Sequence, residues 1–115
     1  MITVPPPPGA DLAQGLWIEE VGDEVTIGLD YSHIHKPWPP LPVDADRMWW
    51  DAAALVDAIL NEEVVAVSGW IDDDCRCGGL RKTGSEPDLP VPNLNRIRYR
   101  SWLGTFDRDE APPAS

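Results

Sequence analysis

The clearest hydrophobic pattern lies between residues 43 and 70, where a helical periodicity leads into a short apolar run. Apolar side chains recur there at intervals of three and four residues, which is the spacing of one face of an α-helix. Asp44 is the expected N-cap, because its carboxylate can accept hydrogen bonds from the first turn, and Asn61 is the expected end. The predicted apolar stripe consists of Met48, Ala52, Leu55, Val56 and Ile59, widened by Trp49 and Leu60.

Two earlier segments, Leu16–Val21 and Glu24–Leu29, alternate between apolar and polar residues. Alternation with a period of two is typical of a strand with one face in the core. Gly22 and Asp23 separate the two segments and form a natural tight turn, so an antiparallel hairpin is predicted. Tyr31 continues the apolar alternation of the second strand.

Two later segments complete the predicted sheet. Val64–Val67 is short, apolar and mostly β-branched, which is typical of a strand covered on both faces. Arg96–Phe106 alternates again and is predicted as a strand. Ile71–Asn95, between them, contains many glycines, prolines and aspartates and is expected to be largely a loop, with room for a short strand near Leu80.

These elements predict an α+β fold in the order β-β-α-β-β. The simplest packing is a four-stranded, largely antiparallel sheet with the helix across one face. Residues 1–11 contain four consecutive prolines and are expected to form a flexible arm. Residues 12–108 are expected to form a single domain, and residues 109–115 a flexible tail.

Charge narrows the range of possible partners. Twenty acidic residues against nine basic ones give a net charge of −11. Such a surface repels nucleic acid and anionic membranes and attracts basic proteins, although acidity also serves solubility alone. The chain shows no signal peptide and no run near the ~18 apolar residues of a membrane span, so a cytoplasmic location is expected.

Two pairs of potential metal ligands stand out. His33 and His35 are separated by one residue, and Cys75 and Cys77 repeat that spacing. Neutral imidazole and thiolate are ligands of tetrahedral zinc, although this spacing differs from that of zinc fingers. A small zinc-binding module is therefore one hypothesis, and two unrelated pairs of ordinary side chains are the other.

Catalytic motifs are not found in the sequence. It has no nucleophile elbow, no glycine-rich phosphate loop and no helix carrying two histidines one turn apart. A non-enzymatic protein without a cofactor is predicted. Arg96, Arg98 and Arg100 share one face of the last strand and are expected to form ion pairs with Glu19, Asp30 or their neighbours, rather than to bind nucleic acid.

Six tryptophans are too many for a core built on one helix, so some are expected at the surface. Exposed aromatic anchors among carboxylates form a plausible recognition surface for a basic protein. Trp50 is predicted on the polar face of the helix, either packed under a loop or exposed as an anchor. The candidate partner-binding residues are Trp50, Asp51, Asp57, Asp72, Asp73 and Asp74.

Three segments carry a resemblance over residues 15–108: DYSHIHKPW, the helix leading into EEVVAVSGW, and the closing RYRSWLGTFDRD. In this layout the chain resembles the small acidic immunity proteins of bacterial polymorphic toxin systems. The resemblance implies a cytosolic inhibitor that binds a cognate toxin domain, such as a nuclease, and blocks its active site. The alternatives are the zinc-binding module and an inhibitor of another nucleic-acid enzyme.

Overall fold

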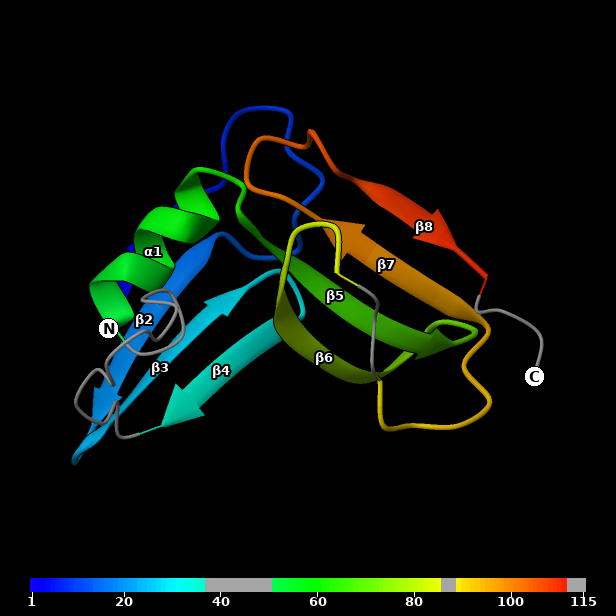
Figure 1. Ribbon diagram of the computed structural model, residues 1–115, viewed down its shortest axis with the longest axis horizontal. Helices are drawn as coiled ribbons and strands as arrows, with labels where there is room; N and C mark the ends of the chain where they lie inside the picture. Colours follow the sequence, from blue (N-terminus) through cyan, green and yellow to red (C-terminus); the bar gives the residue numbers. More distant parts are fainter. Residues whose placement is uncertain (37–50, 86–88, 112–115) are drawn as a thin grey trace.

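The computed structural model describes residues 1–36, 51–85 and 89–111, which form two four-stranded antiparallel sheets and one helix (Figure 1). Sheet A has the strand order β1-β2-β3-β4, and sheet B has the order β6-β5-β7-β8. The elements are β1 (Ile2–Val4), β2 (Leu16–Val21), β3 (Glu24–Leu29), β4 (Ser32–Lys36), α1 (Ala52–Leu60), β5 (Val64–Ile71), β6 (Asp74–Lys82), β7 (Arg96–Arg100) and β8 (Arg108–Glu110).

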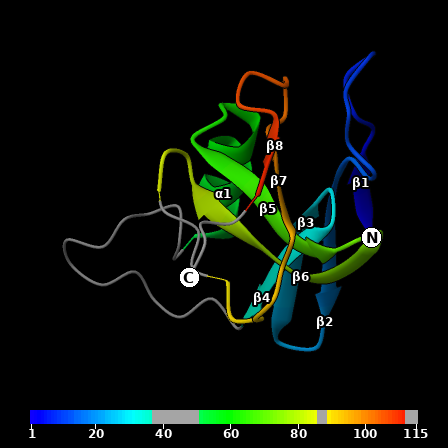
Figure 2. The ribbon, with the colours of Figure 1, turned by 90° about the vertical axis from the view of Figure 1, so that its right-hand side faces the viewer.

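The predicted hairpin is confirmed with the expected bounds. β2 pairs antiparallel with β3 from Trp17–Gly28 to Val21–Glu24. Gly22 in the turn has a φ of +61°, a left-handed conformation that glycine adopts without steric cost. Sheet A then continues as a simple meander, and β1 forms its outer edge (Figure 2).

Strand β5 is buried on both faces, as its apolar sequence predicts. Every residue from Val64 to Trp70 is buried, because β5 lies between β6 and β7 in sheet B and packs on both sides. One face joins α1 and sheet A in the main core, and the other packs with β7 in a smaller core. The buried members of the two are Leu16, Ile27, Leu29, Leu55, Ala58, Ile59, Val64, Ala66, Leu80 and Trp102, and Val65, Val67, Ile97 and Tyr99.

The α+β class is confirmed, but the single four-stranded sheet is wrong. The four predicted strand segments are divided between two sheets, and β1, β4, β6 and β8 complete them. β6 contains the strand expected near Leu80, but at Asp74–Lys82 it takes up much of the segment expected to be a loop. These additional strands are short or polar: β4 reads SHIHK and β6 reads DCRCGGLRK. β4 and β6 contain few residues of high strand propensity, and β1 and β8 are only three residues long, so pairing with neighbouring strands determines their conformation.

The helix begins later than predicted. Asp51 has an extended backbone, with φ −129° and ψ 117°, so a continuous helix starting after Asp44 cannot pass through it. Asp51 is itself the N-cap, and its carboxylate accepts hydrogen bonds from the N–H groups of Ala53 and Ala54. Asn61 is the C-cap, as expected. Met48, Trp49 and the Asp44 cap lie outside the described residues.

Both ends of the chain differ from the expected arm and tail. Ile2–Val4 pairs with Leu16–Ile18, and Arg108–Glu110 pairs with β7, so each contributes an edge strand. β8 exists because the predicted strand Arg96–Phe106 stops at Arg100. The chain turns there: the N–H of Ser101 donates to Oδ1 of Asp107 at 2.9 Å, and the N–H of Phe106 donates to Oγ of Ser101 at 3.0 Å.

Candidate functional site

A buried ion pair joins the two sheets. Nε of Arg98, on β7, lies 2.9 Å from Oδ2 of Asp30, at the turn between β3 and β4. The Asp30 side chain is 1% exposed and that of Arg98 is 12% exposed. Burial alone lowers the pKa of Arg98, but the hydrogen bond and the charge of Asp30 outweigh it and raise the pKa. The predicted pairing of this arginine face with Asp30 is confirmed.

Arg100 also forms ion pairs with carboxylates of this chain. Its guanidinium lies 2.8 Å from Oδ2 of Asp11 and 2.7 Å from Oδ1 of Asp109. The charge of Arg100 is the main cause that lowers the pKa of Asp11. Glu19, the other partner expected for this face, forms no ion pair within the described part of the chain. Arg98 and Arg100 therefore form ion pairs within the chain. The remaining charge at the surface is mainly acidic.

Tyr31, Trp70 and Arg96 form a stack at the junction of the two sheets. The Tyr31 ring meets the Trp70 ring edge-on, with centroids 4.8 Å apart, and the Arg96 guanidinium lies 4.7 Å from the Trp70 ring centroid. Trp70 is also held by its Nε1–H, which donates to Oγ of Ser68 at 2.9 Å. Tyr31 remains 44% exposed, so a rigidly supported aromatic side chain faces outwards.

An acidic turn continues directly from this stack. Trp70 and Arg96 are register partners. The β5–β6 turn that follows β5 exposes Asp72 and Asp73, and Asp74, the first residue of β6, is exposed as well. Asn95 holds the turn in place: its Oδ1 accepts the N–H of Asp72 at 2.9 Å, and its Nδ2 donates to Oδ1 of Asp72 at 3.0 Å. These two hydrogen bonds hold the turn against the segment that precedes β7.

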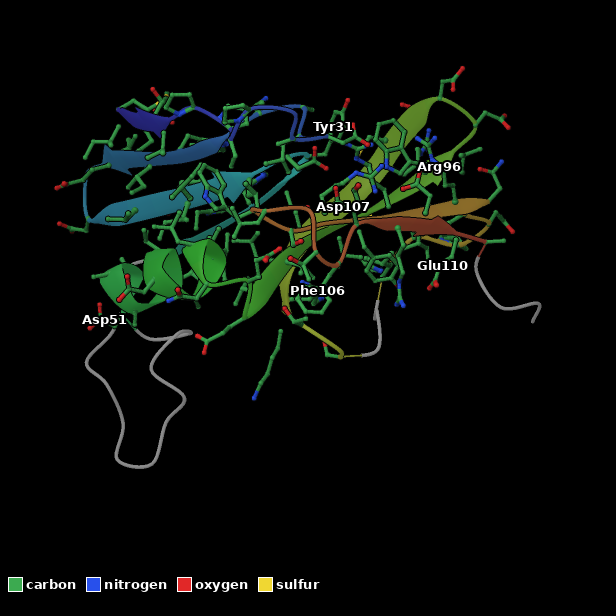
Figure 3. The ribbon with its side chains drawn as sticks, turned by 90° about the horizontal axis from the view of Figure 1, so that it is seen from above. Tyr31, Asp51, Arg96, Phe106, Asp107 and Glu110 are labelled. Carbon is green, nitrogen blue, oxygen red and sulfur yellow. The ribbon has the colours of Figure 1, made fainter. Side chains whose placement is uncertain are left out.

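We define the recognition patch as Tyr31, Trp70, Arg96 and Asp72–Asp74. It combines aromatic and arginine side chains, which are enriched at energetically important interface positions, with an acidic border. Figure 3 shows Tyr31 and Arg96 on one side of sheet B, and Asp51 at the opposite end of the molecule. The candidate residues predicted from the sequence thus fall into two separate groups, not one surface.

The candidates on or next to α1, which are Trp50, Asp51 and Asp57, have less support as an interface. Asp57 is exposed on α1, but Asp51 is committed to capping that helix. Trp50 lies outside the described residues. The described tryptophans are not prominent surface anchors either: Trp70 and Trp102 are buried, and Trp17 is partly buried against Gly28. The other three, Trp38, Trp49 and Trp50, lie outside the described residues.

The histidine and cysteine pairs do not assemble into a metal centre. His33 and His35 share a face of β4, with ring centroids 5.7 Å apart, and Nδ1 of His35 pairs with Glu24. Within residues 1–36, 51–85 and 89–111, which include all four candidate ligands, no three potential ligands gather around one point. Burial raises the pKa of the Cys75 thiol, which makes it a weak nucleophile at neutral pH.

Sequence reasoning missed the roles of Tyr31 and Arg96. Tyr31 continues the alternation of β3 and was assigned to the core face. The chain instead turns at Asp30, whose φ is +57°, and Tyr31 emerges at the surface. The sequence feature that indicates this turn is Asp30, directly after the predicted strand, because aspartate tolerates the left-handed conformation of tight turns. No comparable signal marked Arg96 as the partner of the Trp70 ring.

Glu62 is a structural carboxylate that the sequence did not reveal. Oε2 accepts the N–H groups of Leu103 and Thr105 at 3.3 and 3.1 Å, and Oε1 accepts the Thr105 hydroxyl at 2.6 Å. It ties the end of α1 to the turn before β8. Burial by itself raises the pKa of Glu62, but the hydrogen bonds it accepts outweigh this and lower it.

Glu62→Gln is expected to destabilise the protein at neutral pH and to lose its effect in acid. A lowered pKa means that Glu62 contributes stability above its unfolded-state pKa of about 4.3, and that this contribution disappears as the pH falls through the folded-state pKa. Melting temperatures of the wild type and Glu62→Gln, measured over a pH series, should converge below that range. Glu63→Gln, an exposed neighbour, is the control. A difference that stays constant with pH would contradict the assigned role.

Comparison with protein-family models, with curated proteins and with solved structures gives no match. In the part of the chain that the structure describes, no helix has the length and apolar character to cross a lipid bilayer.

Proposed function

We propose that this protein is a non-enzymatic binding protein that captures a basic protein partner through the recognition patch. The resemblance to immunity proteins points to a bacterial toxin domain, such as a nuclease, as that partner. The observation that carries the proposal is an exposed Tyr31 packed edge-on against Trp70, which Arg96 covers, together with the acidic turn that follows Trp70 in sequence and is held by Asn95. Pre-organised side chains lose little conformational entropy on binding, so their contacts contribute more to affinity.

Charge supports a basic partner over other classes. The net charge of −11 speeds association with a cationic surface and disfavours nucleic acid. Arg98 and Arg100 already pair with carboxylates of this chain, the buried Asp30 and the exposed Asp11, and Arg76 pairs with Asp74 at 2.8 Å. Asp72 and Asp73 are exposed in the turn that follows Trp70, so this end of the patch carries carboxylates.

The test measures binding to the protein encoded by the neighbouring gene, by calorimetry. Tyr31→Ala is expected to weaken binding by roughly 30-fold or more, as loss of an interface hot spot does. Asp73→Lys should weaken it by placing a cation against a basic partner. Affinity should also fall as salt rises.

Asp57→Lys is the matched control, because it reverses an exposed aspartate on α1, far from the patch. It should leave binding nearly unchanged. Melting temperatures of all three variants separate loss of binding from loss of folding. The proposal is overturned if Asp57→Lys weakens binding as much as Asp73→Lys, or if neither patch variant has an effect while the fold is intact.

A further inference from the structure

A cavity of about 450 Å³ lies at the outer edge of sheet A, where β1 pairs with β2 (Figure 2). Its volume falls within the range of about 300–1,000 Å³ that small-molecule sites occupy. Residues of β1 and β2, and of the segments next to them, line it. Gly15 permits the two segments to approach this closely, because a Cβ at that position would overlap the carbonyl oxygen of Val4.

The walls of this cavity are mostly apolar. Val4 and Pro5 contribute from the first segment, and Trp17 contributes an aromatic wall from β2. The indole of Trp17 rests against Gly28 of β3, where a Cβ would overlap the ring. Trp17 is therefore supported by the sheet beneath it. An apolar group that enters the cavity leaves water for this surface, which is favourable in proportion to the area buried.

A single carboxylate accompanies these apolar walls. Glu19 is the only ionisable side chain among the described residues that line the cavity. It follows Trp17 by two positions on β2, so both side chains project from the same face of the strand. Across the described ranges of the chain, Glu19 forms no ion pair, and neither does the α-amino group of Met1, a lining residue that is 79% exposed. The Glu19 carboxylate is therefore available to pair with a ligand.

We infer that this cavity binds a small organic cation: an amine whose apolar body packs against Val4, Pro5 and Trp17 and whose ammonium group pairs with Glu19. Removal of the apolar body from water provides the main driving force, and a charge-assisted hydrogen bond to the carboxylate orients the ammonium group. An indole ring also attracts an ammonium group within about 6 Å of its centroid. The net charge of −11 favours cations over anions in addition.

This inference goes beyond the proposed function, because the described lining of the cavity contains no residue of the recognition patch. The two proposals also concern different ligands, a small amine and a basic protein. Failure of one in its own experiment therefore leaves the other standing.

The experiment compares three probes that share a phenethyl body: 2-phenylethylammonium, the neutral 2-phenylethanol and the anionic 3-phenylpropionate. Each is titrated into the intact protein, and binding is followed by calorimetry and by the NMR signals of the Trp17 indole and the Val4 methyl groups. The ammonium probe is expected to shift these signals and to bind about tenfold more tightly than the alcohol, because it alone gains the charge-assisted bond. The inference is overturned if the anion binds as tightly as the ammonium probe, or if the Trp17 and Val4 signals do not shift.

Variants distinguish a built site from a general attraction of cations to an acidic protein. Glu19→Gln is expected to remove the tenfold preference for the ammonium probe and to leave binding of the alcohol nearly unchanged. Glu20→Gln is the matched control: it removes the same charge at the next position of β2, where the side chain projects from the other face and does not line the cavity. Melting temperatures verify that both variants are folded. A preference that survives in Glu19→Gln, or that is lost equally in Glu20→Gln, would refute the role of Glu19.

Discussion

Asp30→Asn is expected to lower the free energy of unfolding by about 3 kcal/mol, because it removes the buried carboxylate partner of Arg98 and leaves only the exposed Asp11, 3.6 Å from Nη2, to balance the charge. Asp30 is 1% exposed and accepts hydrogen bonds from Nε and Nη2 of Arg98 and from the N–H of Ala13. Asparagine tolerates the left-handed φ of +57° at this position, so backbone strain does not contribute. Urea denaturation followed by tryptophan fluorescence measures the change.

A double-mutant cycle with Arg98→Met isolates the interaction of this pair. The double variant is expected to be more stable than the sum of the two single losses implies, because no uncompensated buried charge remains. Glu20→Gln removes an exposed carboxylate of β2 and should change stability by less than about 0.5 kcal/mol. Strictly additive losses in the cycle would show that Asp30 stabilises its turn without acting through Arg98.

This ion pair also explains which parts of the fold were predictable. The hairpin of β2 and β3 was predictable from the alternation of apolar and polar residues on either side of Gly22. The buried strand β5 was predictable from an unbroken apolar run. The division into two sheets depends instead on contacts distant in sequence, such as Arg98 with Asp30 and the Ser32 hydroxyl with the carbonyl of Val67. No short sequence window contains both partners of such a contact.

The additional strands illustrate the same limit. β6 contains Gly78 and Gly79, which normally argue against a strand. A Cβ at Gly78 would lie 2.6 Å from the carbonyl oxygen of Tyr31, so glycine is needed where β6 passes the β3–β4 turn. The sequence shows the glycine, and only the assembled structure shows the close approach that requires it.

The candidate site was partly predictable for a related reason. Three consecutive aspartates identify a charged turn from composition alone, and the structure places Asp72 and Asp73 in such a turn, with Asp74 beginning β6. Arg96 meets Trp70 through the pairing of β7 with β5, and Tyr31, in the β3–β4 turn, meets it only where sheet A and sheet B pack together. The acidic component of the recognition patch is therefore local in sequence, and its aromatic component is not.

Ile59→Ala is expected to cost about 2–5 kcal/mol in the free energy of unfolding, because it removes a fully buried side chain from the core between α1 and the sheets. Leu60→Ala, at the next position of the same helix, is the matched control: Leu60 is 36% exposed, and the substitution leaves no enclosed cavity. Alanine favours the helix more than isoleucine does, so helix propensity opposes the loss at position 59 and cannot account for it. Equilibrium unfolding in urea measures both variants, and similar losses would contradict the packing of α1 through its Leu55–Ile59 face.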